Sequence, residues 1–96
     1  MITVNITEYL KRNGMRVKYV DDRTLKDYAG ANYYFAKAVG FPYPYPENVI
    51  LIDKKLSSEK RAKTIIHEVV ERNLMRQGEN YWSAHQIALE MEKDVD

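Results

Sequence analysis

The longest helical pattern in this chain is centred on residues 64–71, Thr-Ile-Ile-His-Glu-Val-Val-Glu. Apolar residues recur around it at positions 62, 65, 66, 69, 70 and 74, which is the spacing of a helix with one buried face. Ser57 is a suitable N-cap residue, Glu59 follows in the first turn, and Gly78 is typical of a helix end. These signals predict a helix between Ser57 and Gly78.

A second helix is expected directly after this one. Asn80 is a suitable N-cap, and the residues expected on the inner face are Trp82, Ala84, His85, Ala88, Leu89 and Met91. Because the turn at residues 78–80 is short, we expect the second helix to fold back antiparallel onto the first. The two helices should therefore form a hairpin.

The segments before residue 21 predict one helix and one strand. Asn5 begins a capping box, which indicates a helix over residues 6–13. Residues 15–20 alternate apolar with basic side chains, the period of a half-buried strand. After this strand, Asp22 or Thr24 is suited to cap a single helical turn.

The middle of the chain holds an ambiguous segment, a loop and a second strand. Residues 31–39 contain an aromatic run that favours a strand and an alanine-containing run before Gly40 that favours a helix, and we predict a helix. Three prolines in residues 41–46 predict an extended loop. Residues 48–52 are apolar on both faces of a strand, so both faces should be covered.

The expected fold class is α+β, with a small sheet packed on the C-terminal helical pair. A chain of 96 residues has room for one domain, which we place at residues 1–96. Within it, residues 1–47 form an N-terminal α/β portion, and residues 48–90 hold the second strand and the helix pair.

Composition excludes several classes of function. With 15 basic and 14 acidic residues the net charge is +1, which makes nucleic-acid binding an unfavoured expectation. No apolar run approaches the roughly 20 residues of a membrane span, and the first four residues lack the basic start of a signal peptide. We therefore expect a cytoplasmic protein without a membrane segment.

Three side chains of the helix pair form a candidate metal site. His67 and Glu71 are four residues apart, so they lie about 40° apart around a helix and can reach one ion. The sequence has no cysteine, so a metal must be held by imidazole and carboxylate groups. His85, the other histidine, can return to Glu71 through the hairpin. Glu68 points about 100° from His67 and is a candidate general base.

The run His67-Glu68-x-x-Glu71, followed by a helix with Tyr81 and Ala84-His85, resembles the zincin metallopeptidase superfamily in a variant form. The usual motif is H-E-x-x-H with a glutamate from a later helix, so the second histidine and the glutamate are exchanged here. The resemblance covers residues 49–90. It implies a minimal zincin-like fold, Zn²⁺ as the cofactor, and residues 49–52 as the strand that runs along the substrate cleft.

The leading hypothesis is a zinc-dependent metallopeptidase-like hydrolase of peptide bonds. Its substrate would be a peptide or protein, and a homo-oligomer could supply missing walls of the substrate site. The alternative is a non-catalytic module, of viral or mobile-element origin, that binds metal or a partner through its helices. We interpret Tyr81 and Trp82 as packing residues, Asp53 as a cap, and the basic residues 54–63 as a solvated face.

Overall fold

The computed structural model describes residues 5–95, which form five helices and three strands. In chain order they are α1 (Ile6–Arg12), β1 (Arg16–Val20), α2 (Asp22–Leu25), β2 (Gly30–Ala31), α3 (Tyr33–Val39), β3 (Val49–Asp53), α4 (Ser58–Arg76) and α5 (Tyr81–Lys93). The expected α+β class is confirmed. The predicted helices at 31–39, 57–78 and after residue 80 are also confirmed, with ends that differ by at most two residues.

The three strands form one sheet in the order β1-β3-β2. Strand β1 is parallel to β3, with Arg16 opposite Val49, and β2 is antiparallel to β3, with Gly30 opposite Ile52. As expected, β3 is buried on both faces, since Val49 to Ile52 are all buried. The sequence did not predict β2, because two residues are too few to show a periodic pattern.

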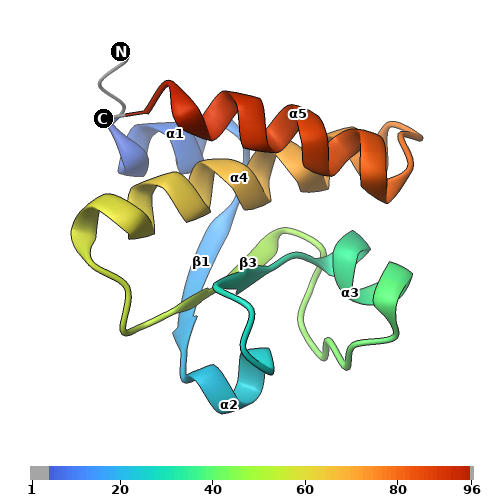
Figure 1. Ribbon diagram of the computed structural model, residues 1–96, viewed down its shortest axis with the longest axis horizontal. Helices are drawn as coiled ribbons and strands as arrows, with labels where there is room; N and C mark the ends of the chain where they lie inside the picture. Colours follow the sequence, from blue (N-terminus) through green and yellow to red (C-terminus); the bar gives the residue numbers. More distant parts are fainter. Residues whose placement is uncertain (1–4, 96) are drawn as a thin grey trace.

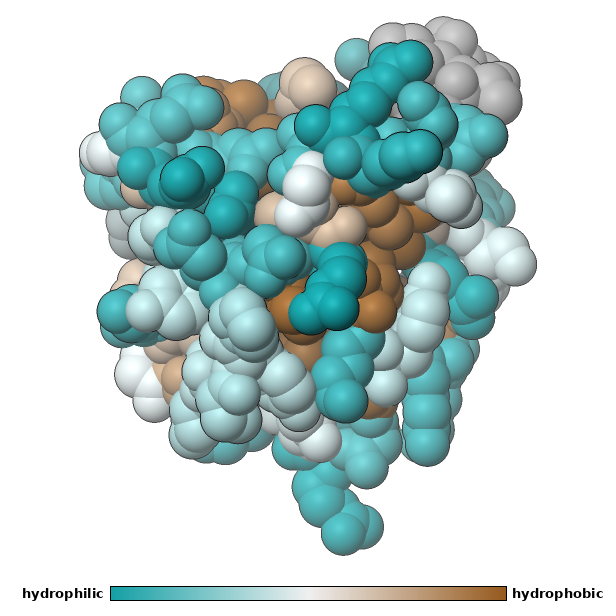
Figure 2. All heavy atoms as spheres, turned by 180° about the vertical axis from the view of Figure 1, so that it is seen from behind, coloured by the Kyte–Doolittle hydropathy of each residue, from teal (hydrophilic) through white to brown (hydrophobic). Residues whose placement is uncertain are grey.

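Alternate residues of β3 enter two core clusters on opposite faces of the sheet. Ile50 and Ile52 pack in one cluster with Met15 and with Ile65 and Val69 of α4. The other cluster lies under α2 and α3 and contains Leu25, Ala31, Phe35, Val49 and Leu51. In Figure 1, α5 lies alongside α4 on one side of the sheet, and α2 lies at the far end from both. Figure 2 shows the rear face, where a small apolar area is surrounded by polar side chains.

Each helix begins at a side chain that accepts a hydrogen bond from the backbone three residues later, which stabilises the first turn. The caps are Asn5, Asp21, Asn32, Ser57 and Asn80. The sequence had placed the second cap at Asp22 or Thr24. This was wrong, by one residue for Asp22 and by three for Thr24, because Asp21 keeps an extended backbone and its carboxylate accepts both the N–H and the hydroxyl of Thr24, each at 2.9 Å.

The exposure of side chains on α5 tests which of its residues face the core. Trp82 is 71% exposed and Met91 is 49% exposed, so their expected places on the inner face of α5 are wrong. The buried residues of α5 are Ala84 and Ala88, whose small side chains allow α5 to approach α4 closely. Among the described residues, no helix combines the length and the apolar character that crossing a membrane would require.

Candidate metal centre

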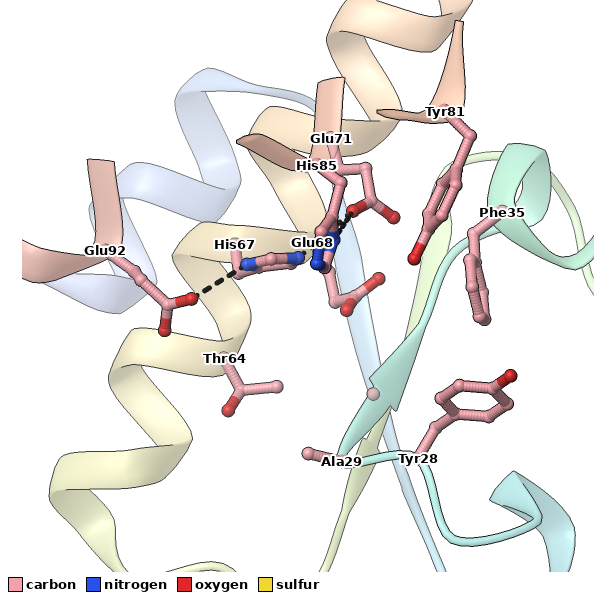
Figure 3. A pocket seen from close by; sticks show the side chains of 11 residues that line it. Tyr28, Ala29, Phe35, Thr64, His67, Glu68, Glu71, Tyr81, His85 and Glu92 are labelled. Atoms are coloured by element: carbon pink, nitrogen blue, oxygen red, sulfur yellow. Dashed lines mark hydrogen bonds and ion pairs between the residues drawn. The ribbon is translucent and has the colours of Figure 1, made fainter. Parts of the chain in front are cut away.

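His67, Glu71 and His85 converge at one point between α4 and α5. Their candidate ligand atoms all lie within 4.8 Å of one another. Oε2 of Glu71 is 3.0 Å from Nε2 of His67 and 2.9 Å from Nδ1 of His85, so one carboxylate oxygen meets both imidazoles. The hairpin register inferred from the sequence therefore brings all three side chains together (Figure 3).

The turn between the helices sets this register. Helix α4 ends at Arg76, and Gly78 has φ +109°, a left-handed backbone that favours glycine. Asn80 then caps α5 by accepting the N–H of Ser83 at 2.9 Å. With α5 starting at a defined residue, His85 lies one turn into the helix and faces Glu71.

The second ring nitrogen of His67 is held by a carboxylate from the end of α5. Nδ1 of His67 donates to Oε1 of Glu92 across 2.9 Å, and the side chain of His67 is only 10% exposed. Histidines that bind metals commonly donate their other N–H to a carboxylate, which fixes the ring orientation. The sequence analysis did not single out Glu92, although it follows His85 by seven residues and so lies on the same helical face two turns later.

Glu68 lines the same pocket and is tied to Glu71 by Asn32. The side-chain amide of Asn32 donates to Oε1 of Glu68 at 2.9 Å and to Oε1 of Glu71 at 3.1 Å. Its carbonyl oxygen accepts the N–H of Phe35, and Asn32 is fully buried. Sequence analysis missed Asn32, whose only local signal is that of a helix cap.

Gly30 allows β2 to approach α4 at this point. A Cβ atom added to Gly30 would lie 2.9 Å from Cγ2 of Thr64 and 3.1 Å from Cγ of Glu68. Both distances are shorter than ordinary van der Waals contact, so a larger residue at position 30 would push Glu68 and its helix away. The edge strand β2, rather than the predicted strand at 49–52, lines the pocket, because β3 is central in the sheet.

Burial and neighbouring charges set the protonation of the metal-free site. Burial opposes charge on His67, but hydrogen bonds to Glu71 and Glu92 and the charge of Glu68 raise its pKa to about 9. Burial, with the nearby charge of Glu71, raises the pKa of Glu68 to about 8. Burial also acts to raise the pKa of Glu71, but the hydrogen bonds from His67 and His85 outweigh it and lower that pKa.

His67, Glu68, Glu71 and His85 line a pocket with a volume of about 240 Å³. One side is formed by His67, Glu68, Glu71, His85 and Glu92, and the other by the rings of Tyr28, Phe35 and Tyr81 (Figure 3). Thr64, Ala29 and Gly30 complete the lining. Tyr81 had been interpreted as a packing residue. It does pack on Phe35, with ring centroids 5.4 Å apart, but it also lines the pocket.

The basic residues 54–63 lie away from this pocket and do not contribute to its lining. Lys55 pairs with Asp22 at 3.4 Å and Lys63 with Glu59 at 4.0 Å, as on a solvated face. Asp53 acts as a cap, since its carboxylate accepts the N–H of Lys55 at 2.9 Å.

Two imidazoles and one carboxylate, with hydrogen-bonded outer partners, form a donor set suited to a zinc ion with one remaining ligand position. The three donors already face one another, so an ion would take the place of the protons between them. Comparison with protein-family models, with curated proteins and with solved structures finds no match to this chain.

Proposed function

We propose that this protein is a zinc-dependent hydrolase of peptide-like bonds. In this proposal His67, Glu71 and His85 bind the ion, and Glu68 is the general base. The observation that carries it is the convergence of three ligand atoms within 4.8 Å, with a fourth carboxylate on the wall of the same pocket. A purely structural ion pair between the helices would not require Glu68 to be buried there.

Zinc, when bound, acidifies a water molecule and polarises a carbonyl group. The remaining work belongs to the side chains. The positive charge of a bound zinc ion would favour the ionised form of Glu68, which burial disfavours in the metal-free site. Asn32 holds Oε1 of Glu68, so Oε2 would be the atom available to accept a proton from the attacking water and to pass it to the leaving amine. Glu92 keeps the ring of His67 directed at the centre, and Asn32 turns Oε1 of Glu71 away so that Oε2 faces both histidines.

The sheet edge beside the pocket supports a peptide as the substrate. The carbonyl oxygen of Ala29 accepts the N–H of Asp53 at 2.9 Å, and Ala31 pairs with Leu51. Because alternate residues of an antiparallel strand direct their backbone groups to opposite sides, the N–H and C=O of Gly30 point away from β3. Gly30 is buried but lines the pocket, so in this proposal a peptide that enters the pocket would pair with this donor and acceptor.

The same proposal includes the setting in which the protein acts. A domain of 96 residues provides few walls for a long substrate, so a second copy or a partner chain is expected to extend the site. The absence of cysteine agrees with a cytoplasmic location.

The first experiment is metal analysis of untagged protein by inductively coupled plasma mass spectrometry, after zinc loading and exhaustive dialysis. We expect about one zinc per chain in the wild type and none in His67→Ala. A peptidase screen on the zinc-loaded protein, with Glu68→Gln as the control, then tests catalysis. No retained zinc would refute the metal site, and equal activity in Glu68→Gln would refute the role of Glu68.

A second candidate function is a non-catalytic module. It is favoured by one observation, which is that Glu71 links His67 and His85 by hydrogen bonds without an ion and so ties α4 to α5. Under this alternative, His85→Ala lowers the free energy of unfolding in the presence of a chelator, and the zinc-loaded wild type cleaves no peptide. Peptide cleavage by the zinc-loaded wild type that is lost in Glu68→Gln would contradict it.

A further inference from the structure

Three aromatic rings from separate parts of the chain form one wall of the pocket. Tyr28 precedes β2, Phe35 belongs to α3 and Tyr81 begins α5. The rings of Tyr28 and Phe35 meet edge to face with centroids 5.0 Å apart, and those of Phe35 and Tyr81 are 5.4 Å apart. We call Tyr28, Phe35 and Tyr81 the aromatic wall (Figure 3).

The aromatic wall reaches the metal centre directly. The ring of Tyr81 lies against the ring of His85, with centroids 5.3 Å apart and planes tilted by 31°. A side chain that contacts Tyr81 is therefore next to the ligands of the ion. The other end of the wall is open, because Tyr28 is 44% exposed while Phe35 is 4% exposed.

The two sides of the pocket differ in charge. Glu68, Glu71 and Glu92 lie on the side of the histidines, and no lysine or arginine is among the described residues that line the pocket. The aromatic wall carries no charge. An acidic side chain would meet the carboxylates of Glu68 and Glu92 with no lysine or arginine to pair with, whereas an aromatic ring would bury apolar surface and make edge-to-face contacts.

We propose that the aromatic wall is the subsite for an uncharged aromatic side chain of the substrate, adjacent to the bond that is hydrolysed. An extended chain paired with Gly30 directs alternate side chains to opposite sides, and one of these sides is the aromatic wall. The inference rests on the proposed function for the reaction itself, but binding of the side chain is separable from turnover.

The test measures binding first. Zinc-loaded Glu68→Gln protein is titrated calorimetrically with three blocked pentapeptides, acetyl-Gly-Gly-X-Gly-Gly-amide, in which X is Phe, Ala or Asp. Removing an aromatic contact surface is expected to weaken binding by about 10- to 100-fold, so the Phe peptide should exceed the Ala peptide by that factor and the Asp peptide should bind most weakly. Equal binding of the three peptides, or no binding of any, would overturn the subsite.

Tyr28→Ala provides the variant and Tyr19→Ala its matched control, both in the Glu68→Gln background. The two tyrosines are 44% and 47% exposed, but Tyr19 lies on β1 and does not line the pocket. Tyr28→Ala should reduce the preference for Phe over Ala at least several-fold with zinc content unchanged, and Tyr19→Ala should leave the preference as it was. An unchanged preference in Tyr28→Ala would overturn the assignment.

Turnover of the same peptides by the wild type separates this inference from the proposed function. Cleavage of all three peptides at equal rates would retain the hydrolase and overturn the aromatic subsite. Preferential binding of the Phe peptide without cleavage would uphold the subsite and count against the hydrolase.

Discussion

Replacing Asn32 with Ser tests the central claim about the architecture of the site. Asn32 is both the cap of α3 and the donor to two buried carboxylates, those of Glu68 and Glu71. Serine is also a good N-cap residue, so the variant keeps the cap and removes the amide donors. The matched control is Asn80→Ser, because Asn80 caps α5 with the same 2.9 Å geometry and is exposed.

The expected loss follows from the protonation of the two acceptors. At pH 7 Glu71 is ionised, because its pKa is lowered, and a hydrogen bond to a charged group contributes about 1.5–3 kcal/mol. Glu68, with a pKa of about 8, is largely protonated, and a neutral hydrogen bond contributes about 0.5–1.5 kcal/mol. Asn32→Ser should therefore lower the free energy of unfolding by about 2–4.5 kcal/mol. For a domain of this size, that corresponds to a fall in Tm of roughly 10 °C or more.

The assay is urea unfolding followed by far-ultraviolet circular dichroism, at pH 7 with a chelator present. Asn80→Ser should stay within about 0.5 kcal/mol of the wild type, because only the capping residue changes. If Asn32→Ser were as stable as Asn80→Ser, the two hydrogen bonds to Glu68 and Glu71 would not stabilise the fold, and the argument for a preorganised site would fail.

Four further predictions concern the metal, the pH and the sheet edge. Zinc at one hundred times its dissociation constant should stabilise the wild type by about 2.7 kcal/mol, and His85→Ala should show no such shift in a thermal melt. Glu92→Gln should weaken zinc binding by about 10- to 100-fold in a competition titration with a chelating dye, and unchanged affinity would exclude Glu92 as a positioning group. The free energy of unfolding of the metal-free protein should fall as the pH rises from 5 to 9. In the folded state the pKa is about 8 for Glu68 and about 9 for His67, above the ordinary values of 4.5 and 6.5. The folded state therefore holds these protons more tightly than the unfolded state, and it loses that advantage as they dissociate. Unfolding titrations at pH 5, 7 and 9 check this, and rising stability would contradict it. Gly30→Ala should lower the free energy of unfolding by about 1–3 kcal/mol in a urea titration, because the added methyl group crowds Glu68. A variant as stable and active as the wild type would show that the close approach of β2 to α4 is not required.

Elements with long, regular patterns could be predicted from the sequence. The helix around residues 64–71 was correctly placed because its apolar residues repeat with helical spacing and capping residues bound it. The strand near Ile50 and Leu51 was correctly placed because it is a short continuous apolar run of mainly β-branched residues after a proline-rich loop. The short strand β2 and the exposure of Trp82 were not. A two-residue strand exists only through its pairing with β3, and whether a helix buries a given residue depends on what lies beside it.

The sequence by itself indicated the helix hairpin, the candidate metal ligands His67, Glu71 and His85, and the position of Glu68 on the same helix as His67. These follow from local spacing, because residues within a helix and across a short turn have few relative positions available. Only the tertiary structure decided that Asn32 binds both Glu68 and Glu71, 36 and 39 residues away in the chain, and that Tyr28 and Phe35 line the pocket of the candidate metal site. Such contacts arise from the packing of β2 and α3 against α4, and nothing in the local sequence of Asn32 distinguishes it from the other capping asparagines.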